Sequence, residues 1–366
     1  MEQETEMSGQ HATARNKTRN PAIGICRLVA AIFVVFIHYG FPGEFGNVIN
    51  CLARFSVSFF FVVSGYFVYH ADESVIKKRV VGILKLNIYA SMLYVFWGAC
   101  QEEYFISQSR IAWLTGALSN YHLSRWLLYC QNPFAGHLWY LAAILTCYIM
   151  IWVYARWINK TYYYRPLYII SISLFAVHFV LSSLAVMTDL DVPRVLYRNA
   201  WFFGIPMFSL GIFIREYQDR MIETYKLSIR KLMLVVAFGA VLSVIQWRGI
   251  GKAEIPFGTV FEVIALMLLL VSIPPEIQRN NTLSMITSQF GSLSTYIYVT
   301  HLFWKDIYVM HIENHIYVFG EFILDYLSPI FVVLLSACTG VIWIFIKEMV
   351  QKVLRGFSFS VKRRNR

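Results

Sequence analysis

The stretch IGICRLVAAIFVVFIHYGF, residues 23–41, is predominantly apolar and carries one cation, Arg27, and one histidine, His38. As an α-helix it is long enough to cross the hydrocarbon core of a bilayer. The two polar residues are eleven positions apart, so they lie within about 20° of one helix face and about 16 Å apart along the axis. Ionisable side chains at membrane depth are costly and usually face a cavity or a site. Either residue alone is better explained as an anchor or a hydrogen-bonded core residue, but the pair on one face favours a function.

The composition of the whole chain is that of a polytopic membrane protein. Hydrophobic residues make up 58% and charged residues only 14% of the 366 residues, and the mean hydropathy is +0.54. A soluble chain of this length has a more polar composition. The net charge of +11 is compatible with a nucleic-acid partner, but the cations lie in short loops between apolar stretches. We therefore expect the lipid bilayer as a partner and no nucleic acid.

The apolar stretches predict an all-α integral membrane protein with about ten transmembrane helices. The predicted spans are residues 22–41, 49–70, 80–100, 136–157, 166–187, 199–215, 229–247, 256–274, 290–311 and 322–347. We expect them to form one transmembrane domain, residues 21–348. A disordered cytoplasmic tail, residues 1–20, precedes this domain, and a basic cytoplasmic tail, residues 349–366, follows it.

The distribution of the cations predicts the orientation. With ten alternating spans, 24 of the 32 Lys and Arg residues fall on the side that holds both termini, and 8 fall on the other side. Loops rich in Lys and Arg remain in the cytoplasm. We therefore expect cytoplasmic N- and C-termini and an external loop over residues 101–135.

Five blocks of sequence resemble, in order, the motifs of membrane acyltransferase family 3. They are Arg27 to His38, with an Arg-x10-His pattern, then Arg54 to Tyr66, His137 to Leu141, Arg198 to Gly204, and Ser294 to His301. Each block is weak alone, but together they cover almost the whole chain. Many members of the family carry an arginine cluster and a proline at the start of the third helix. Here the region reads Lys77-Lys78-Arg79, then Lys85, without proline, so the residues of a basic donor contact cannot be assigned by match.

This resemblance implies a multi-pass enzyme of the bacterial plasma membrane that acts as an O-acyltransferase. The acyl group, most simply acetyl, would pass from cytoplasmic acyl-CoA (acetyl-CoA), a co-substrate, to a hydroxyl of a cell-envelope glycan or lipid-linked sugar. Such a transfer needs a base for the hydroxyl proton and cations or N–H groups for the developing oxyanion. His38 is the best candidate base, because imidazole titrates near neutral pH. Arg27 stays protonated and can bind phosphate or carbonyl oxygens of the donor.

Other polar residues of the five blocks are candidates for substrate binding. They are Arg54, Ser64, His137, Trp139, Arg198, Asn199 and His301. His137 and His301 could hydrogen-bond an acceptor, orient His38 or be satisfied core histidines. Ser64 and Gly65 could instead allow close helix packing. Glu262 is predicted to form an ion pair with Arg54 or Arg198 at membrane depth. The six cysteines show no metal-binding spacing, and we expect neither a metal nor a permanently bound cofactor.

Two other functions remain open at this point. The blocks resemble those of a Gram-positive subgroup of the family and also the membrane domain of the vancomycin-resistance serine racemases, which is linked to amino-acid supply. A transporter or supply module for a small polar metabolite such as an amino acid is therefore the alternative. Broken helices at matching positions in two halves would favour it, but the sequence has no clear inverted repeat. A purely structural partner of an envelope-synthesis complex is a third possibility.

Overall fold

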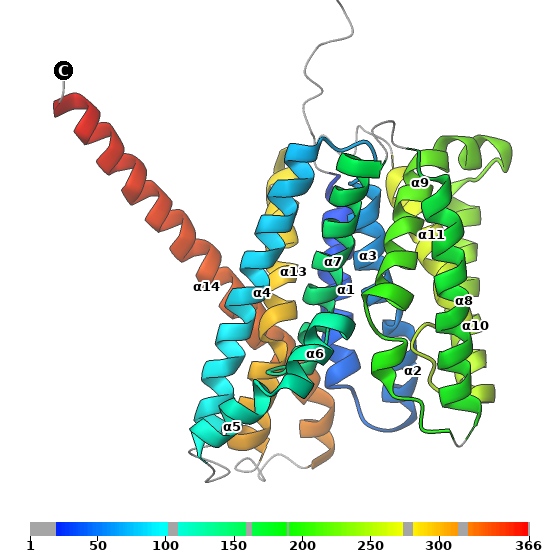
Figure 1. The fold of residues 1–366 in the computed structure, drawn as a ribbon, viewed down its shortest axis with the longest axis horizontal. Coiled ribbons are helices and arrows are strands. Elements are labelled where there is room, and N and C mark those ends of the chain that lie inside the picture. The colour runs from blue at the N-terminus through cyan, green and yellow to red at the C-terminus, as the bar shows by residue number, and fades with distance from the viewer. Residues whose placement is uncertain are drawn as a thin grey trace, which may run out of the picture.

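The computed structural model describes residues 20–101, 109–158, 163–188, 190–273, 281–313 and 321–364. These residues form a bundle of helices that run roughly along one axis (Figure 1). Within these ranges there is no β-strand, so the predicted all-α class is confirmed. Residues 1–19 of the predicted N-terminal tail and residues 365–366 of the C-terminal tail lie outside the described residues.

A helix lies over every predicted span. The main helices are α1 (Pro21–His38), α2 (Gly43–Ala53), α3 (Phe55–Tyr66), α4 (Glu73–Gln101), α7 (Trp139–Val153), α8 (Arg165–Met187), α9 (Ile205–Thr224), α10 (Ile229–Ile250), α11 (Phe257–Val271), α13 (Asn281–Ile307) and α14 (Glu321–Arg364). Shorter elements are α5 (Arg110–Ala117), α6 (Asn120–Tyr129), the 3-10 turns η3 (Gly136–Leu138) and η5 (Arg194–Leu196), and the π-helical turns η4 (Tyr154–Ile158), η6 (Ala200–Gly204) and η7 (Tyr308–Glu313).

Seven helical segments of the described chain are long and apolar enough to cross a membrane. They are residues 21–38, 43–66, 73–101, 136–156, 165–187, 229–250 and 325–352. α11 has 15 residues and is shorter than these spans. The protein is thus a multi-pass membrane protein, whereas the count of ten crossings remains a prediction.

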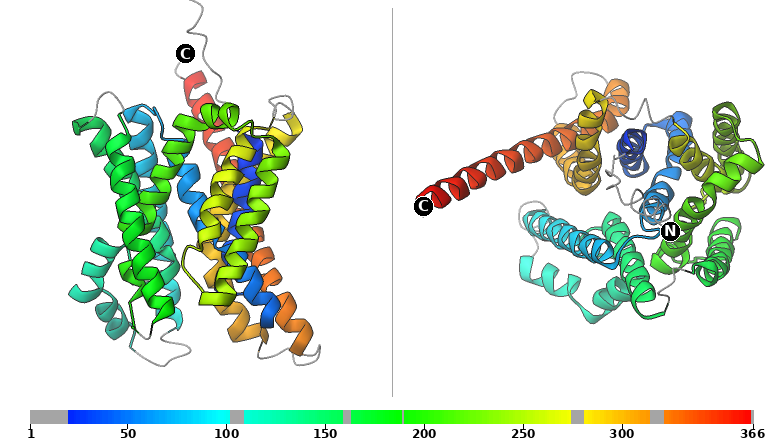
Figure 2. Two further views of the ribbon diagram at one scale, coloured as in Figure 1. Left: turned by 90° about the vertical axis from the view of Figure 1, so that its right-hand side faces the viewer. Right: turned by 90° about the horizontal axis from the view of Figure 1, so that it is seen from above.

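The ends of the bundle can be told apart along the chain. α1 begins and α14 ends at the upper end in Figure 1, whereas α2, α5 and α6 lie near the lower end. We call the end where α1 begins the inner end and the end where α1 reaches His38 the outer end, after the predicted topology. Seen from above, α14 runs past α13 and out of the bundle (Figure 2). The predicted basic tail continues this helix as far as Arg364.

Local sequence explains where the first elements begin and break. The Asn20 side chain accepts hydrogen bonds from the backbone N–H groups of Ala22 and Ile23, and Pro21 occupies the first turn, so α1 has a typical helix start. The predicted span 49–70 is instead two helices, α2 and α3, separated at Arg54. This break places Arg54 at the outer end, beside the end of α1.

Close packing of α3 on α9 depends on two glycines. A methyl group added at Gly65 would lie 1.8 Å from the Phe208 carbonyl oxygen, and one at Gly211 would lie 2.0 Å from the Val62 carbonyl oxygen. Real side chains cannot approach a backbone oxygen so closely, so both positions require glycine. The packing interpretation of the Ser64-Gly65 pair therefore holds for Gly65.

Candidate active site

Three histidines from three distant parts of the chain meet at the outer end of the bundle. His38 is the last residue of α1, His137 lies in η3, and His301 lies in α13. The ring centroid of His38 is 5.2 Å from that of His301 and 6.2 Å from that of His137. The rings of His137 and His301 are 4.9 Å apart. His137 and His301 are buried, whereas His38 is partly exposed.

The hydrogen bonds of His301 determine the position of its proton. Its Nδ1 lies 2.8 Å from the Tyr298 carbonyl oxygen. A carbonyl oxygen only accepts, so Nδ1–H donates and Nε2 of the neutral ring carries the lone pair. Within the described residues, this Nε2 and both ring nitrogens of His137 are buried and form no hydrogen bond of good geometry. Buried polar atoms are normally hydrogen-bonded, so unpaired nitrogens in one cluster are typical of a site that binds a polar ligand.

Over the part of the chain that the structure describes, no group of three His, Cys, Asp or Glu residues is placed to hold a metal ion. The cluster is better suited to proton transfer, because neutral imidazoles offer both N–H donors and lone pairs.

A chain of hydrogen bonds fixes the last turn of α1, from which His38 projects. The Asn50 side chain donates to the carbonyl oxygens of Ile37 and Phe36 at 3.1 and 3.4 Å. Arg54 donates from Nη2 to the Asn50 Oδ1 at 3.3 Å. These carbonyls belong to the helix end, where no intrahelical partner is available. Asn50 and Arg54 therefore hold the backbone beside His38.

Arg54 and Arg198 share one carboxylate, that of Glu254 in the loop between α10 and α11. Their Nη1 atoms lie 3.4 and 3.9 Å from the two Glu254 oxygens. Burial raises the pKa of the Glu254 carboxyl, but Arg54, Arg198 and Arg194 more than offset this effect and hold it below its ordinary value. The expected pairing with Glu262 is wrong. That residue lies within α11, and both arginines pair with the loop carboxylate instead.

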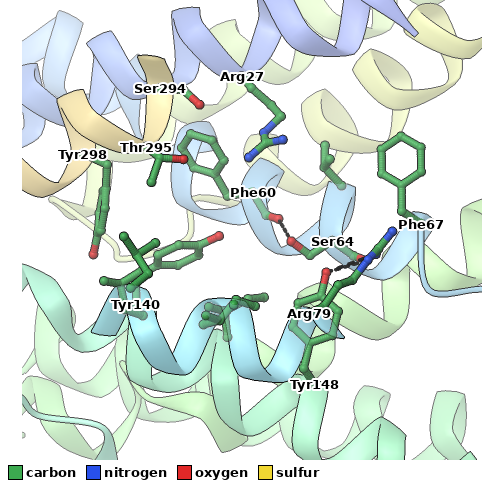
Figure 3. A pocket seen from close by; sticks show the side chains of 16 residues that line it. Arg27, Phe60, Ser64, Phe67, Arg79, Tyr140, Tyr148, Ser294, Thr295 and Tyr298 are labelled. Atoms are coloured by element: carbon green, nitrogen blue, oxygen red, sulfur yellow. Dashed lines mark hydrogen bonds between the residues drawn. The ribbon is translucent and has the colours of Figure 1, made fainter. Parts of the chain in front are cut away.

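A cavity of about 440 Å³ lies closer to the inner end, between α1, α3, α4, α7 and α13. Arg27 of α1 and Arg79 of α4 both point into it (Figure 3). Arg79 donates from Nη1 to the Tyr148 hydroxyl at 3.3 Å. Arg27 is partly buried and has no carboxylate partner among the described residues. The cavity thus carries two guanidinium groups and no described anion to balance them.

Two tyrosines close the end of this inner cavity opposite Arg79 (Figure 3). The rings of Tyr140 and Tyr298 are 5.4 Å apart. Beyond them, the Tyr298 ring lies 5.6 Å from His137 and 6.1 Å from His301. The Tyr298 hydroxyl also donates a hydrogen bond to the His137 carbonyl oxygen. One layer of tyrosine therefore separates the inner cavity from the histidine cluster.

The sequence as a whole identifies the family. Residues 20–349 match the model of acyltransferase family 3, which is described as an acyltransferase domain. The chain belongs to this family. Neither a curated protein nor a solved structure matches it. The match covers all of the helices that build the histidine cluster and the inner cavity, so the family implies an acyltransferase activity for this membrane protein.

The other predicted site residues of this acyltransferase lie in different surroundings. Ser64 lines the inner cavity, and its hydroxyl donates to the Phe60 carbonyl oxygen at 2.8 Å. Trp139 is buried, and the Arg198 guanidinium carbon lies 5.6 Å from its ring centroid. The substrate-binding roles predicted for these residues stay predictions.

Asn199 has a structural role that the sequence did not predict. Its Oδ1 accepts hydrogen bonds from the backbone N–H groups of Trp201 and Phe202, and its Nδ2 donates to two carbonyl oxygens of the preceding turn. It therefore caps η6 with all of its polar atoms engaged, and it is fully buried.

Sequence reasoning missed Arg79, Tyr140 and Tyr148 as residues of the inner cavity. Arg79 lies in the basic run that could not be assigned by match, and Lys77 and Lys78 beside it are exposed. Cavity-lining positions of α4 follow Arg79 at helical spacing, namely Gly82, Ile83 and Leu86. That spacing of three, four and seven residues was the signal that could have found Arg79.

Proposed function

We propose that this membrane acyltransferase moves an acyl group, most simply acetyl, from cytoplasmic acyl-CoA to a hydroxyl of a cell-envelope glycan or lipid-linked sugar in the bacterial plasma membrane. The observation that supports this best is the arrangement of two sites along α1. A cavity with two arginines lies towards the inner end of α1, and a histidine cluster lies at its outer end. In the predicted topology these ends face the side where CoA is made and the side of the envelope. One layer of tyrosine lies between them.

The inner cavity suits the donor. Guanidinium groups bind phosphate oxygens through paired N–H donors, and acyl-CoA is rich in phosphate. Arg27 and Arg79 would hold these phosphates while the thin pantetheine arm extends towards Tyr140 and Tyr298. The Tyr140 hydroxyl lines the cavity and can donate a hydrogen bond to the thioester oxygen as negative charge develops on it.

The histidine cluster suits the acceptor. In the proposed reaction His38 takes the proton of the acceptor hydroxyl as its oxygen bonds to the thioester carbon. The carbon–sulfur bond then breaks, and the CoA thiolate leaves and takes up the proton. His301 acts as a positioning residue, because its Nε2 lone pair can accept the one N–H of neutral His38 and so direct the lone pair of the other His38 nitrogen to the substrate. This is the logic of a base oriented by a third group.

Labelled acetyl-CoA incubated with membranes that contain the protein and the native envelope acceptor tests the function. We expect transfer of label to a glycan or lipid-linked fraction by the wild type. His38→Ala should lower the rate by about 10²- to 10⁴-fold, the usual cost of losing a general base. His122→Ala is the matched control, because His122 is exposed on α6, outside the cluster. Near-normal transfer by folded His38→Ala protein would rule out the proposed base.

A further inference from the structure

A second, polar pocket lies at the outer end, outside the histidine cluster. It has a volume of about 260 Å³ and lies between Arg54 at the break between α2 and α3, the end of α8 with the chain that follows it, and the loop between α10 and α11. Its ionisable lining residues are Arg54, Arg194, Lys252, Asp191 and Glu254. The described lining thus has three cations and two carboxylates.

Among the described residues, the positive charge of this outer pocket is only partly neutralised. Glu254 is shared by two guanidinium groups, since Arg198 lies beside the pocket and pairs with the same carboxylate as Arg54. Lys252 donates to the Asn47 side-chain oxygen, a neutral partner, at 3.0 Å. Arg194 forms no ion pair within the described residues. An anion entering the pocket would therefore meet unbalanced cations.

Cations gather at this outer pocket although they are few on the predicted outer side of the protein. Only 8 of the 32 Lys and Arg residues fall on the predicted outer side. Half of these eight surround this one pocket, namely Arg54, Arg194, Arg198 and Lys252. External loops need no cations for topology. Their gathering at one pocket therefore favours a binding role over a general surface property.

The outer pocket is connected to the histidine cluster through its arginines. Arg54 donates a hydrogen bond to the Asn50 side chain, and Asn50 donates to the last carbonyl oxygens of α1, immediately before His38. Arg198 lies over the ring of Trp139, two residues after His137. A group bound among these arginines would lie next to the residues that position both histidines.

We propose that this outer pocket binds an anionic group, a phosphate or a carboxylate, carried by the acceptor glycan. Arg54, Arg194 and Lys252 hold that group, and a hydroxyl of the same glycan is presented to His38. The inference rests on the proposed function and specifies its acceptor as an acidic glycan. Phosphate and carboxylate share the chemistry of paired oxygens that bind guanidinium, and the experiment distinguishes them.

Direct binding to the purified full-length protein in detergent tests the pocket without relying on activity. The probes are inorganic pyrophosphate, a glucuronate-containing tetrasaccharide and the neutral sugar maltotetraose, each measured with excess CoA to occupy the inner cavity. We expect one of the anionic probes to bind and the neutral sugar not to bind. Arg194→Gln/Lys252→Gln should raise the Kd of that probe at least about tenfold, because two charge-assisted contacts are lost.

The matched control is Arg110→Gln/Arg125→Gln, which removes the same charge from the predicted outer side but away from the pocket. The Kd should not change in this control. If the double variant does not fold, the single variant Lys252→Gln replaces it in the test. Its expected rise in Kd is smaller. Binding of the glucuronate probe alone would assign a carboxylate, and binding of pyrophosphate alone would assign a phosphate.

Two outcomes would overturn the inference, namely no binding of either anion by the wild type or an unchanged Kd in folded pocket variants. Acyl transfer is measured separately with labelled acetyl-CoA and membranes. Transfer without anion binding would refute only the acidic acceptor. Pocket-dependent anion binding without any acyl transfer would refute only the proposed function.

Discussion

Replacement of Arg27 or Arg79 should weaken binding of acyl-CoA, since both guanidinium groups point into one cavity of about 440 Å³. A hydrogen bond to a charged group is worth about 1.5–3 kcal/mol. Loss of one such contact should therefore raise the Kd for acetyl-CoA by about 10- to 150-fold, at 1.4 kcal/mol for each factor of ten. Arg27→Ala and Arg79→Ala should each show a rise of this size.

The lysine variant separates donor binding from anchoring. Arg27→Lys keeps the charge but loses the planar group that binds two oxygens at once, so donor affinity should still fall. If Arg27 only anchors α1, lysine should substitute without effect, because either cation can extend its charge towards water. The matched control is Lys78→Ala, since Lys78 is exposed on the same turn as Arg79.

Isothermal titration of the purified protein with CoA and acetyl-CoA measures these affinities, and thermal unfolding provides a second readout. Two unbalanced cations in one cavity repel each other, so Arg27→Ala without ligand should unfold at the same temperature as the wild type or higher. The wild type should gain more stability from CoA than the variant does, because at one ligand concentration the stabilisation grows as the Kd falls. An Arg27→Lys protein with unchanged donor affinity and rate would refute the donor role of Arg27.

Four further predictions concern positioning, packing, charge and topology. His301→Gln should retain more acyl transfer than His301→Ala and shift the pH–rate profile, because the amide oxygen can still accept the N–H of His38; equal loss in both would contradict the positioning role. Gly65→Ala should lower the free energy of unfolding by about 1–3 kcal/mol or more, because the added methyl group overpacks against the α9 backbone. Gly249→Ala is the control, since Gly249 has open space around it and its replacement should not destabilise the protein. Thermal unfolding measures both variants. The Glu254 carboxylate has a lowered pKa, so it stabilises the fold at any pH above the ordinary carboxyl pKa, and this contribution is lost as the pH falls through the pKa of the folded state. Acid should therefore lower the unfolding temperature of the wild type more than that of Glu254→Gln. Parallel curves of unfolding temperature against pH would contradict this. A cysteine placed at Ser109 should react with an impermeant reagent on intact cells, and labelling only after lysis would reverse the predicted orientation.

Hydropathy predicts this fold well because a membrane helix must satisfy its backbone internally and cover its surface with apolar side chains. Every predicted span therefore coincides with helix, and five of the ten agree with it to within three residues at both ends. In the second span the helix begins at Gly43, six residues before the predicted start, and breaks at Arg54. α4, α9, α13 and α14 extend beyond their predicted spans by seven to seventeen residues. Hydropathy averages over a window and cannot resolve a break at one residue, nor can it show that Arg54 pairs with Glu254, two hundred residues away.

The candidate site was only partly predictable, for reasons of helix packing. His38, His137 and His301 were each candidates, but no spacing in the sequence specifies that α1, η3 and α13 bring their rings together. Depth in the membrane favoured Glu262 as the partner of the arginines. The structure uses Glu254 instead, because the loop after α10 folds back over Arg54 and Arg198.

The tyrosine layer gives the proposed function a physical rationale. An acyl thioester reacts with water as well as with a sugar hydroxyl, so a transferase must keep bulk water away from the reacting carbon. Tyr140 and Tyr298 close the inner cavity on one side, and His137 and His301 are buried on the other. The hydrogen bond from Tyr298 to the His137 carbonyl ties this layer to the histidine cluster. Donor and acceptor would then approach from opposite ends of α1 and meet at a dry aromatic boundary, where the base is available only to a hydroxyl that reaches His38 from the outer side.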